Sequence, residues 1–169
     1  ETAKIATEAA LTGHLVLATL HTNDAPQAVT RLEEMGVERY NVAASLLGVL
    51  AQRLARKLCS CAVPSPPEKV EEYRAAFAEA GLSIPQDATF REPVGCKVCG
   101  GTGYKGRIPI HELMVVTPPL RQAILSAESA SALKEEAVRH GMRTLKQDGL
   151  LKAAKGLTTV QEVIQRTID

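Results

Sequence analysis

The sequence predicts an α/β protein, and three observations lead to this fold class. Apolar residues recur at helical spacing in residues 3–10, whereas residues 14–20 form a mostly apolar run of strand length. The four cysteines of the chain stand in two close pairs. After Thr117 the pattern is typical of successive helices separated by glycines and prolines. We therefore expect helices and strands first, a cysteine-rich lobe next, and a helical region last.

The first part of the chain predicts the order helix, buried strand, polar loop, helix. The apolar run at 14–20 suits a strand buried in a parallel sheet. Residues 21–26 follow it as a polar turn in which Asn23 or Asp24 can cap the next helix. A further helix is predicted at 38–46. In open α/β sheets, ligands bind at loops that follow the carboxyl ends of strands, so this polar loop is a candidate ligand site.

The middle of the chain contains one ambiguous segment, residues 47–58. Leucines at four-residue spacing suit a helix there, whereas polar residues among apolar ones suit a half-buried strand, and the pattern leaves both open. Arg53 and Arg56 could reach a phosphate or a neighbouring subunit, but a solvated strand face is the simpler expectation. A charged helix is predicted at 68–80, and a strand at 107–116.

The last third predicts a helix in each of four segments, which are 119–126, 131–140, 144–155 and the chain from Thr159 onward. Ser131 is the expected cap of the second of these helices. Thr159 and Glu162 have the spacing of a capping box, which marks the start of the last one.

The composition limits the classes of protein that the chain can belong to. At 169 residues it fits one large domain or two small ones, and 45% hydrophobic with 23% charged residues is ordinary for a globular protein. The formal net charge of +1 gives no electrostatic reason to expect nucleic acid or anionic lipid as a direct partner. No apolar run approaches the ~20 residues of a membrane span, so membrane association is expected only through a partner protein.

Cys59 and Cys61 form the first cysteine pair, and Cys96 and Cys99 form the second. Four thiolates can close a tetrahedral shell around Zn²⁺ and leave no position for substrate. Two local pairs separated by a long insertion are the usual arrangement of such a site. Glycines after the second pair let the backbone turn sharply and bring N–H groups close to sulfur. The sequence therefore favours a structural zinc site.

Three other interpretations of the cysteines stay open. They could form two disulfides, contain a redox Cys-x-x-Cys motif, or be four unrelated thiols. The chain has no signal-peptide pattern, and Cys59 and Cys61 are poorly placed to bridge each other. A redox pair normally opens a helix, whereas glycines follow Cys99. One residue between the first two ligands is tighter than the usual spacing, so their loop is expected to differ from a standard zinc knuckle.

Several motifs, in order along the chain, resemble one protein family. Residues 13–25 are similar to the His box of the secretion-superfamily ATPases, the hexameric motors of type II secretion and type IV pilus assembly. Residues 1–3 resemble the end of that family's Walker B segment, and residues 51–59 and 103–107 resemble the two flanks of its tetracysteine motif. Residues 141–149 and 156–159 resemble its C-terminal helices. The cysteines point to the secretion and pilus-extension branch, because the retraction motors generally lack them.

The resemblance implies a fold and a domain organisation. The fold is the distal part of a RecA-like P-loop ATPase domain with a tetracysteine zinc lobe and a C-terminal helical subdomain. The implied domains are residues 1–58 for the C-terminal portion of the RecA-like core, 59–107 for the zinc lobe, and 108–169 for the C-terminal strand and helices. The family usually separates its first cysteine pair by two residues, so the geometry at Cys59 and Cys61 is expected to differ.

The implied function is that of a C-terminal fragment of a hexameric ATPase that powers type IV pilus assembly or type II secretion. The intact protein would bind ATP and Mg²⁺, form a homo-hexamer and act through an inner-membrane platform protein. This implies a cytoplasmic location, peripheral to the inner membrane. The chain contains no G-x-x-x-x-G-K-[ST] motif. Without a P-loop to hold the phosphates, this segment alone is expected to be inactive.

The resemblance also implies site residues in and beside the polar loop. His14 and His21 would be the His-box residues, with a supporting catalytic role near the γ-phosphate. By composition alone, a histidine at a strand end is more often a cap or a surface residue, and the surrounding motif favours the role for His21 more than for His14. Thr19, Thr22 and Asp24 would contact the nucleotide side. Their alternative roles are a strand residue, a turn and a helix cap.

A stand-alone zinc-binding interaction module is the alternative function. Cys96, Cys99, Gly101 and Gly103 have the spacing of one repeat from the zinc domain of J-domain co-chaperones. That family needs several copies of the repeat, and this chain contains one. A P-loop and an acidic Walker B segment before Glu1 would support the motor, and their absence would support the module.

Overall fold

A computed structural model describes residues 1–168 and divides the chain into two compact units. The first unit comprises residues 1–51 and 112–143, and the second comprises residues 52–111 and the chain from Thr144 onward. Each unit has a hydrophobic core of its own.

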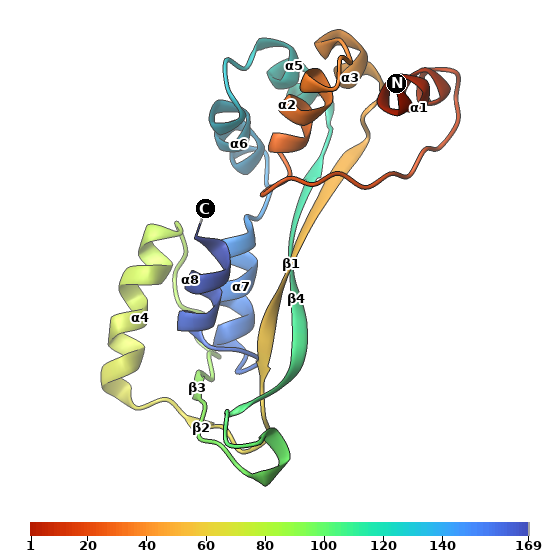
Figure 1. The fold of residues 1–169 in the computed structure, drawn as a ribbon. Helices are drawn as coiled ribbons and strands as arrows, with labels where there is room; N and C mark the ends of the chain where they lie inside the picture. Colours follow the sequence, from red (N-terminus) through yellow and green to blue (C-terminus); the bar gives the residue numbers. More distant parts are fainter. Residues whose placement is uncertain (169) are drawn as a thin grey trace. The chain divides into compact units, whose positions relative to one another are not determined.

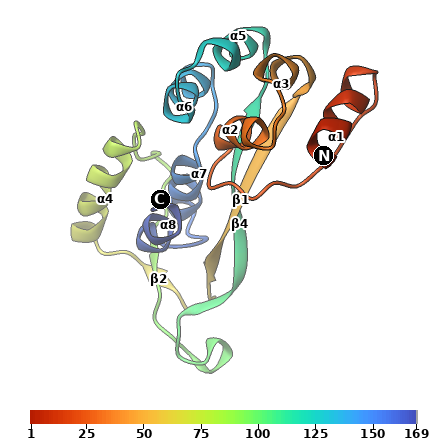
Figure 2. The same ribbon diagram turned by 45° about the horizontal axis from the view of Figure 1, so that its top comes forward.

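Two long strands contribute residues to both units. β1 (Gly48–Leu58) and β4 (Tyr104–Val115) pair as a two-stranded sheet, and Figures 1 and 2 show them side by side. The strand alternative for residues 47–58 is therefore the correct one. On β4, Ile110 and Met114 are fully buried while the residues that follow them in alternation are more exposed. This period of two is the signature of a strand with one buried face.

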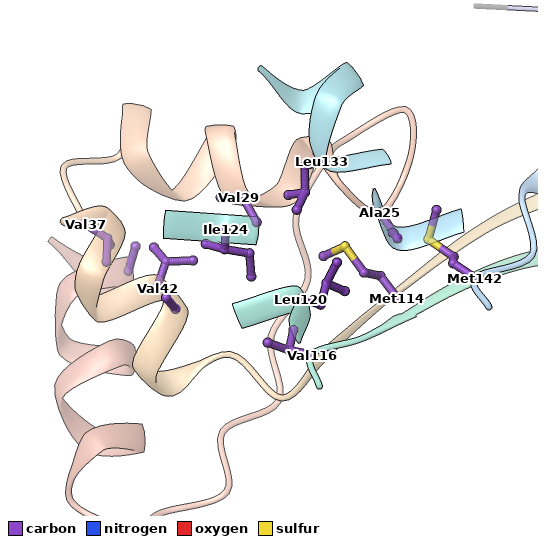
Figure 3. Packing of buried hydrophobic residues seen from close by; sticks show 13 residues of the cluster. Ala25, Val29, Val37, Val42, Met114, Val116, Leu120, Ile124, Leu133 and Met142 are labelled. Carbon is purple, nitrogen blue, oxygen red and sulfur yellow. The ribbon is translucent and has the colours of Figure 1, made fainter. Parts of the chain in front are cut away.

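The first unit consists of helices and the adjoining ends of the two long strands. Its helices are α1 (Thr2–Leu11), α2 (Gln27–Glu34), α3 (Arg39–Ser45), α5 (Pro118–Ser126) and α6 (Ala130–Arg139). Figure 3 shows the side chains of its core, among them Val29 of α2, Ile124 of α5 and Leu133 of α6. Each of these three side chains is at most 4% exposed, so helices far apart in the sequence share one core.

Residues 14–20 do not form the buried strand that the apolar pattern predicts. The segment has no regular secondary structure, and Leu15 and Leu17 are 75% and 88% exposed. A strand needs a hydrogen-bonded neighbour, and within residues 1–168 no strand pairs with this segment. The apolar composition of residues 14–20 is compatible with a buried strand, but such a strand forms only where neighbouring strands provide hydrogen-bond partners.

The second unit contains the cysteines and the last two helices. Its elements are β2 (Val63–Pro64), α4 (Pro67–Glu79), β3 (Arg91–Glu92), the 3₁₀ helix η1 (Lys97–Cys99), α7 (Leu145–Ala154) and α8 (Val160–Thr167). In its core, Phe77 of α4 meets Phe90 edge to face, with the ring centroids 5.8 Å apart. Gly149 lets α7 and α8 pack closely, because a Cβ there would lie 2.5 Å from Cγ1 of Val163.

Helix caps differ from the prediction at two helices. Ser129, not Ser131, caps α6, because its side chain accepts a hydrogen bond from Ala132 N. Thr159 caps α8 as predicted, but Glu162 does not complete the capping box. The Glu162 carboxylate instead binds the guanidinium of Arg56, and charge-assisted hydrogen bonds of this kind are stronger than a neutral one.

Candidate metal centre and polar loop

The four cysteines converge in the second unit. The two residues of the first pair directly follow β1, and those of the second pair flank and end η1. All four Sγ atoms lie within 4.8 Å of one another. Cys59 and Cys96 are 3.9 Å apart, as are Cys61 and Cys99, and Cys96 and Cys99 are 3.8 Å apart. A tetrahedral shell with Zn–S bonds of about 2.3 Å places its sulfurs about 3.8 Å apart, so the arrangement fits a four-thiolate metal ion.

The same distances exclude the disulfide interpretation. A disulfide joins sulfurs about 2.05 Å apart, and all four cysteines are free thiols here. Four sulfurs that all lie within 4.8 Å of one another also argue against unrelated thiols and against a single redox pair. The geometry is that of one closed cluster.

The one-residue spacing of the first pair is accommodated by a tight turn. Cys59 N donates to the Gly103 carbonyl at 2.9 Å, which ties the end of β1 to the start of β4. Ala62 N then donates to the Cys59 carbonyl at 3.0 Å and closes a turn over Ser60 and Cys61. This turn replaces the longer loop of a standard knuckle and still brings both sulfurs to the cluster.

Backbone N–H groups stabilise negative charge on one sulfur in particular. Burial raises the pKa of Cys99, but the N–H groups of Cys96 and Gly103, 3.1 and 3.2 Å from its Sγ, lower that pKa to about 6. At Cys61 a backbone hydrogen bond from Gly95 lowers the pKa, but burial and the neighbouring sulfurs outweigh it and raise the pKa to about 11. A divalent cation that binds four thiolates would therefore displace protons from this cluster.

Gly103 is required beside the cluster by both its backbone and its surroundings. Its φ is +76°, and an added Cβ would lie 2.4 Å from Pro93 Cβ. Gly103→Ala is expected to destabilise the second unit by about 2–3 kcal/mol, because a left-handed backbone and a steric clash add together. Gly100→Ala is the matched control, since Gly100 has φ +62° with no atom within 4 Å of a Cβ, and about 1 kcal/mol is expected. Urea unfolding of both variants measures the difference, and equal losses would contradict the steric argument.

A buried carboxylate connects β1 with α8 in the same unit. The Glu162 side chain is 0% exposed, and its Oε2 accepts from Nε and Nη2 of Arg56 at 2.8 and 2.7 Å. Its Oε1 accepts from the Arg56 backbone N–H and from Arg166 Nε, each at 3.0 Å. Burial raises the pKa of Glu162, but these donors lower it to about 2. Arg56 is exposed on β1, as predicted, with a side chain 45% exposed, and it also forms an ion pair with Glu162 of α8.

Tyr104 adds a second connection from the cysteine cluster to the last helix. The Arg56 guanidinium carbon lies 4.1 Å from the centroid of the Tyr104 ring, a cation–π contact. The Tyr104 hydroxyl is 3.0 Å from Oγ1 of Thr159, the cap of α8. The strand that leaves the cysteines is therefore fixed to α8 directly through Thr159 and indirectly through Arg56, which binds Glu162. Sequence reasoning missed these contacts because it assigned Glu162 to a capping box.

The two predicted His-box histidines have different surroundings in the first unit. His14 lies just beyond the end of α1, with its Nδ1 3.2 Å from the Ala9 carbonyl oxygen and 3.3 Å from Thr12 Oγ1. This is the geometry of a helix-end residue. His21 is exposed at the start of the polar loop, and Thr19 lies in the exposed segment before it.

The other two predicted loop residues lie in one turn. The Thr22 hydroxyl donates to the Asp24 carbonyl at 3.0 Å, and Asp24 Oδ1 accepts from Gln27 N at 3.1 Å. Asp24 thus binds the first backbone N–H of α2 from the turn before it, although Pro26, not Asp24, occupies the N-cap position. Its Oδ2 forms an ion pair of 2.9 Å with Lys134 of α6, which the sequence analysis did not single out. Asp24 itself is 6% exposed.

Glu112 is the second residue of this loop region that sequence reasoning missed. It is 0% exposed, and its Oε1 accepts from Ala25 N at 2.8 Å. A signal was present, because Glu112 stands on the buried, alternating face of β4 between Ile110 and Met114. An acidic residue on such a face has to be hydrogen-bonded, and this requirement marks it as a candidate contact residue.

The comparisons with known proteins agree along the chain. Residues 1–165 match the family model described as Type II/IV secretion system protein. The chain is 56% identical over 170 residues to the type IV pilus assembly ATPase PilB of Thermus thermophilus, a match that covers 100% of this chain and 19% of that protein. It is 48% identical over 169 residues to type II secretion system protein E of Pectobacterium carotovorum subsp. carotovorum, covering 99% of this chain and 32% of that protein. The chain thus spans about a fifth to a third of the length of these relatives.

A solved structure shares the fold. The match is to the crystal structure of the pilus retraction motor PilT with bound ADP, with a TM-score of 0.64 and 21% sequence identity. It covers 99% of this chain and 36% of the PilT chain. The predicted α/β class is thereby confirmed. Among the described residues, no helix combines the length and the apolar character that crossing a membrane requires. The family match over residues 1–165 also favours a secretion-family segment over a stand-alone zinc module. This chain belongs to the Type II/IV secretion system protein family.

Proposed function

We propose that this chain supplies the His box and the tetracysteine lobe of a hexameric ATPase that powers type IV pilus assembly or type II secretion. The observation that carries the proposal is the similarity to type IV pilus assembly ATPases, which extends over the whole chain. The cysteine cluster supports it, because the resemblance places a tetracysteine motif at this point of the family's sequence. ATP and Mg²⁺ are the cofactors of the intact protein, whose P-loop is not part of these 169 residues.

The finer assignment of the fold is part of the proposal. Residues 1–58 belong to a RecA-like core, residues 59–107 to the zinc lobe, and residues 108–169 to the C-terminal strand and helical subdomain. These boundaries follow the motifs, whereas the two compact units follow the packing of the described residues. The structural likeness to a retraction motor supports the assignment at the level of the fold.

The four cysteines hold one Zn²⁺ in a structural role, and the ligands are Cys59, Cys61, Cys96 and Cys99. The separations of their sulfurs support this assignment. A zinc ion with four thiolates has no free coordination position, so it stabilises the lobe and binds no substrate. The backbone N–H groups at Cys99 stabilise the negative charge of one ligand sulfur.

The polar loop lies on the nucleotide side of the intact motor. His21 contacts the γ-phosphate region and His14 has a weaker supporting role, while Thr19, Thr22 and Asp24 belong to the nucleotide side of the loop. The exposure of His21 supports its assignment, since a side chain in contact with its own helix end, like that of His14, is less free to reach a ligand.

The partners follow from the same resemblance. The intact protein forms a homo-hexamer and works on the cytoplasmic side of the inner membrane through a platform protein. The near-neutral net charge of this chain supports the absence of a direct nucleic-acid partner.

The proposal is tested by ATP hydrolysis in the intact protein. We expect Mg²⁺-dependent turnover by the intact protein and none by the 169-residue chain, which lacks a P-loop. His21→Ala is expected to lower kcat about a hundredfold, because His21 acts on the charge that develops at the γ-phosphate. His140→Ala is the matched control, since His140 is an exposed helix-end residue paired with Glu136. An intact protein without turnover, or equal kcat values for the two variants, would contradict the assignment.

A further inference from the structure

The loop that carries His21 is fixed at its far end by three carboxylate contacts. Asp24 Oδ1 accepts from Gln27 N at 3.1 Å, and Asp24 Oδ2 lies 2.9 Å from Lys134 Nζ. Glu112 Oε1 accepts from Ala25 N at 2.8 Å. We call Asp24, Glu112 and Lys134 the loop clamp. Its contacts join two consecutive loop residues to β4, α2 and α6 of the first unit.

The clamp is built from groups whose burial has to be compensated. Glu112 is fully buried and Asp24 nearly so, and burying a carboxylate is strongly unfavourable unless it is hydrogen-bonded. Ala25, which donates to Glu112, is itself 0% exposed and lies in the core of the unit (Figure 3). An apolar residue at position 112 would match its neighbours on β4 and would have no such requirement. The buried carboxylate therefore binds the loop to β4.

The chain before the clamp is held much less tightly. Leu17 is 88% exposed, and residues 14–20 form no ladder with any strand of the described chain. From Thr22 onward the turn is internally bonded, with the Thr22 hydroxyl on the Asp24 carbonyl and Asn23 N donating to Gln27 Oε1 at 3.3 Å. The position of His21 therefore depends on the bonded turn and the clamp that follow it, and not on the exposed segment that precedes it.

We propose that Glu112 and Lys134 are positioning residues of the ATPase reaction, because they fix the loop that presents His21 to the nucleotide. The inference rests on the role proposed above for His21. Each of the two positioning residues acts through the backbone or the carboxylate of a loop residue that is distant in sequence, by 87 residues for Glu112 and 110 for Lys134.

Glu112→Leu and Glu112→Gln in the intact ATPase separate the contact from the bulk of the side chain. Leucine removes the acceptor for Ala25 N, whereas glutamine keeps a carbonyl oxygen that accepts the same hydrogen bond. We expect the leucine variant to lower kcat about tenfold to a hundredfold with KM for ATP changed by less than about threefold, since a misplaced catalytic group affects the transition state more than ground-state binding. The glutamine variant is expected to restore most of kcat.

A double-mutant cycle tests whether Glu112 acts through His21. In a His21→Ala background, Glu112→Leu is expected to lower kcat no further, because the loop no longer presents the imidazole of His21 to the nucleotide. Amide hydrogen exchange in residues 22–28 is expected to become faster with Glu112→Leu and to stay near wild type with Glu112→Gln. Lys134→Met should behave like Glu112→Leu, and Lys134→Arg should retain the ion pair. Glu34→Gln, an exposed carboxylate on α2, is the control.

The outcomes separate this inference from the proposed function. If the intact wild-type protein shows no ATP turnover, the proposed ATPase function is overturned. The proposed role of the clamp in that reaction is then overturned as well. An active wild type overturns the clamp alone if Glu112→Leu leaves kcat and the exchange of residues 22–28 unchanged. The clamp is likewise overturned if the effects of Glu112→Leu and His21→Ala on kcat multiply, because independent effects show that Glu112 does not act through His21.

Discussion

Cys96→Ser is expected to abolish metal binding and to unfold the lobe around the cluster. The segment beside the second cysteine pair has little apolar packing, since Val94 and Val98 are 58% and 59% exposed. We therefore expect the order of this segment to depend on a bound metal, because metal binding contributes directly to the folding free energy of small zinc sites. We expect a loss of at least about 3 kcal/mol, which lowers the melting temperature by about 10 °C.

Segment-resolved hydrogen exchange distinguishes the loss of the lobe from general unfolding. Exchange is expected to become faster in residues 59–64 and 93–104 and to stay slow in α2 and α3 of the first unit. Ser60→Ala is the matched control, because Ser60 is an exposed residue between two ligands and its loss removes no thiolate. A Cys96→Ser protein with wild-type zinc content and melting temperature would show that the sulfurs have another role.

Arg56→Met is expected to destabilise the second unit by about 2 kcal/mol. Removing one partner of a buried ion pair typically costs about 3–5 kcal/mol, because a buried charge is left uncompensated. The loss here is smaller because Arg166 still binds Glu162 and the Arg56 side chain is 45% exposed. Arg74→Met is the matched control, since it breaks an exposed pair with Glu71 and should cost less than about 0.5 kcal/mol.

The pH dependence provides an independent check of the same contact. The pKa of Glu162 is lowered from 4.5 to about 2, so the contribution of its charge to stability is complete above pH 4.5 and is lost as the pH falls through about 2. This contribution amounts to about 3 kcal/mol. The stability gap between wild type and Arg56→Met should therefore narrow as the pH falls through this window in urea titrations. A gap that stays constant would show that Arg56 stabilises by packing alone.

The sequence predicted the features that depend on local pattern. Three predicted helices, α3, α4 and α7, occur where they were expected. The convergence of the cysteines was also predictable, because soft ligands in two pairs have few other reasons to occur together. Local pattern left residues 47–58 ambiguous, because a half-buried strand and an amphipathic helix share several apolar positions.

The remaining features depend on partners distant in sequence. Residues 14–20 have the composition of a buried strand, but burial needs neighbouring strands, which the described chain does not place beside them. Glu162 has the spacing of a capping residue, and only the approach of β1 to α8 turns it into the partner of Arg56. Glu112 could have been noticed as the acidic member of an apolar strand face. Its partner, the backbone N–H of Ala25, could not have been predicted from the sequence.

Metal content and X-ray absorption of the freshly purified, reduced protein test the central claim most directly. The claim is that four sulfurs from two distant cysteine pairs bind a single ion and thereby order the lobe between them. We predict one zinc ion per chain, surrounded by four sulfur atoms at about 2.3 Å. Protein without stoichiometric zinc, or zinc bound by fewer than four sulfurs together with nitrogen or oxygen ligands, would contradict it.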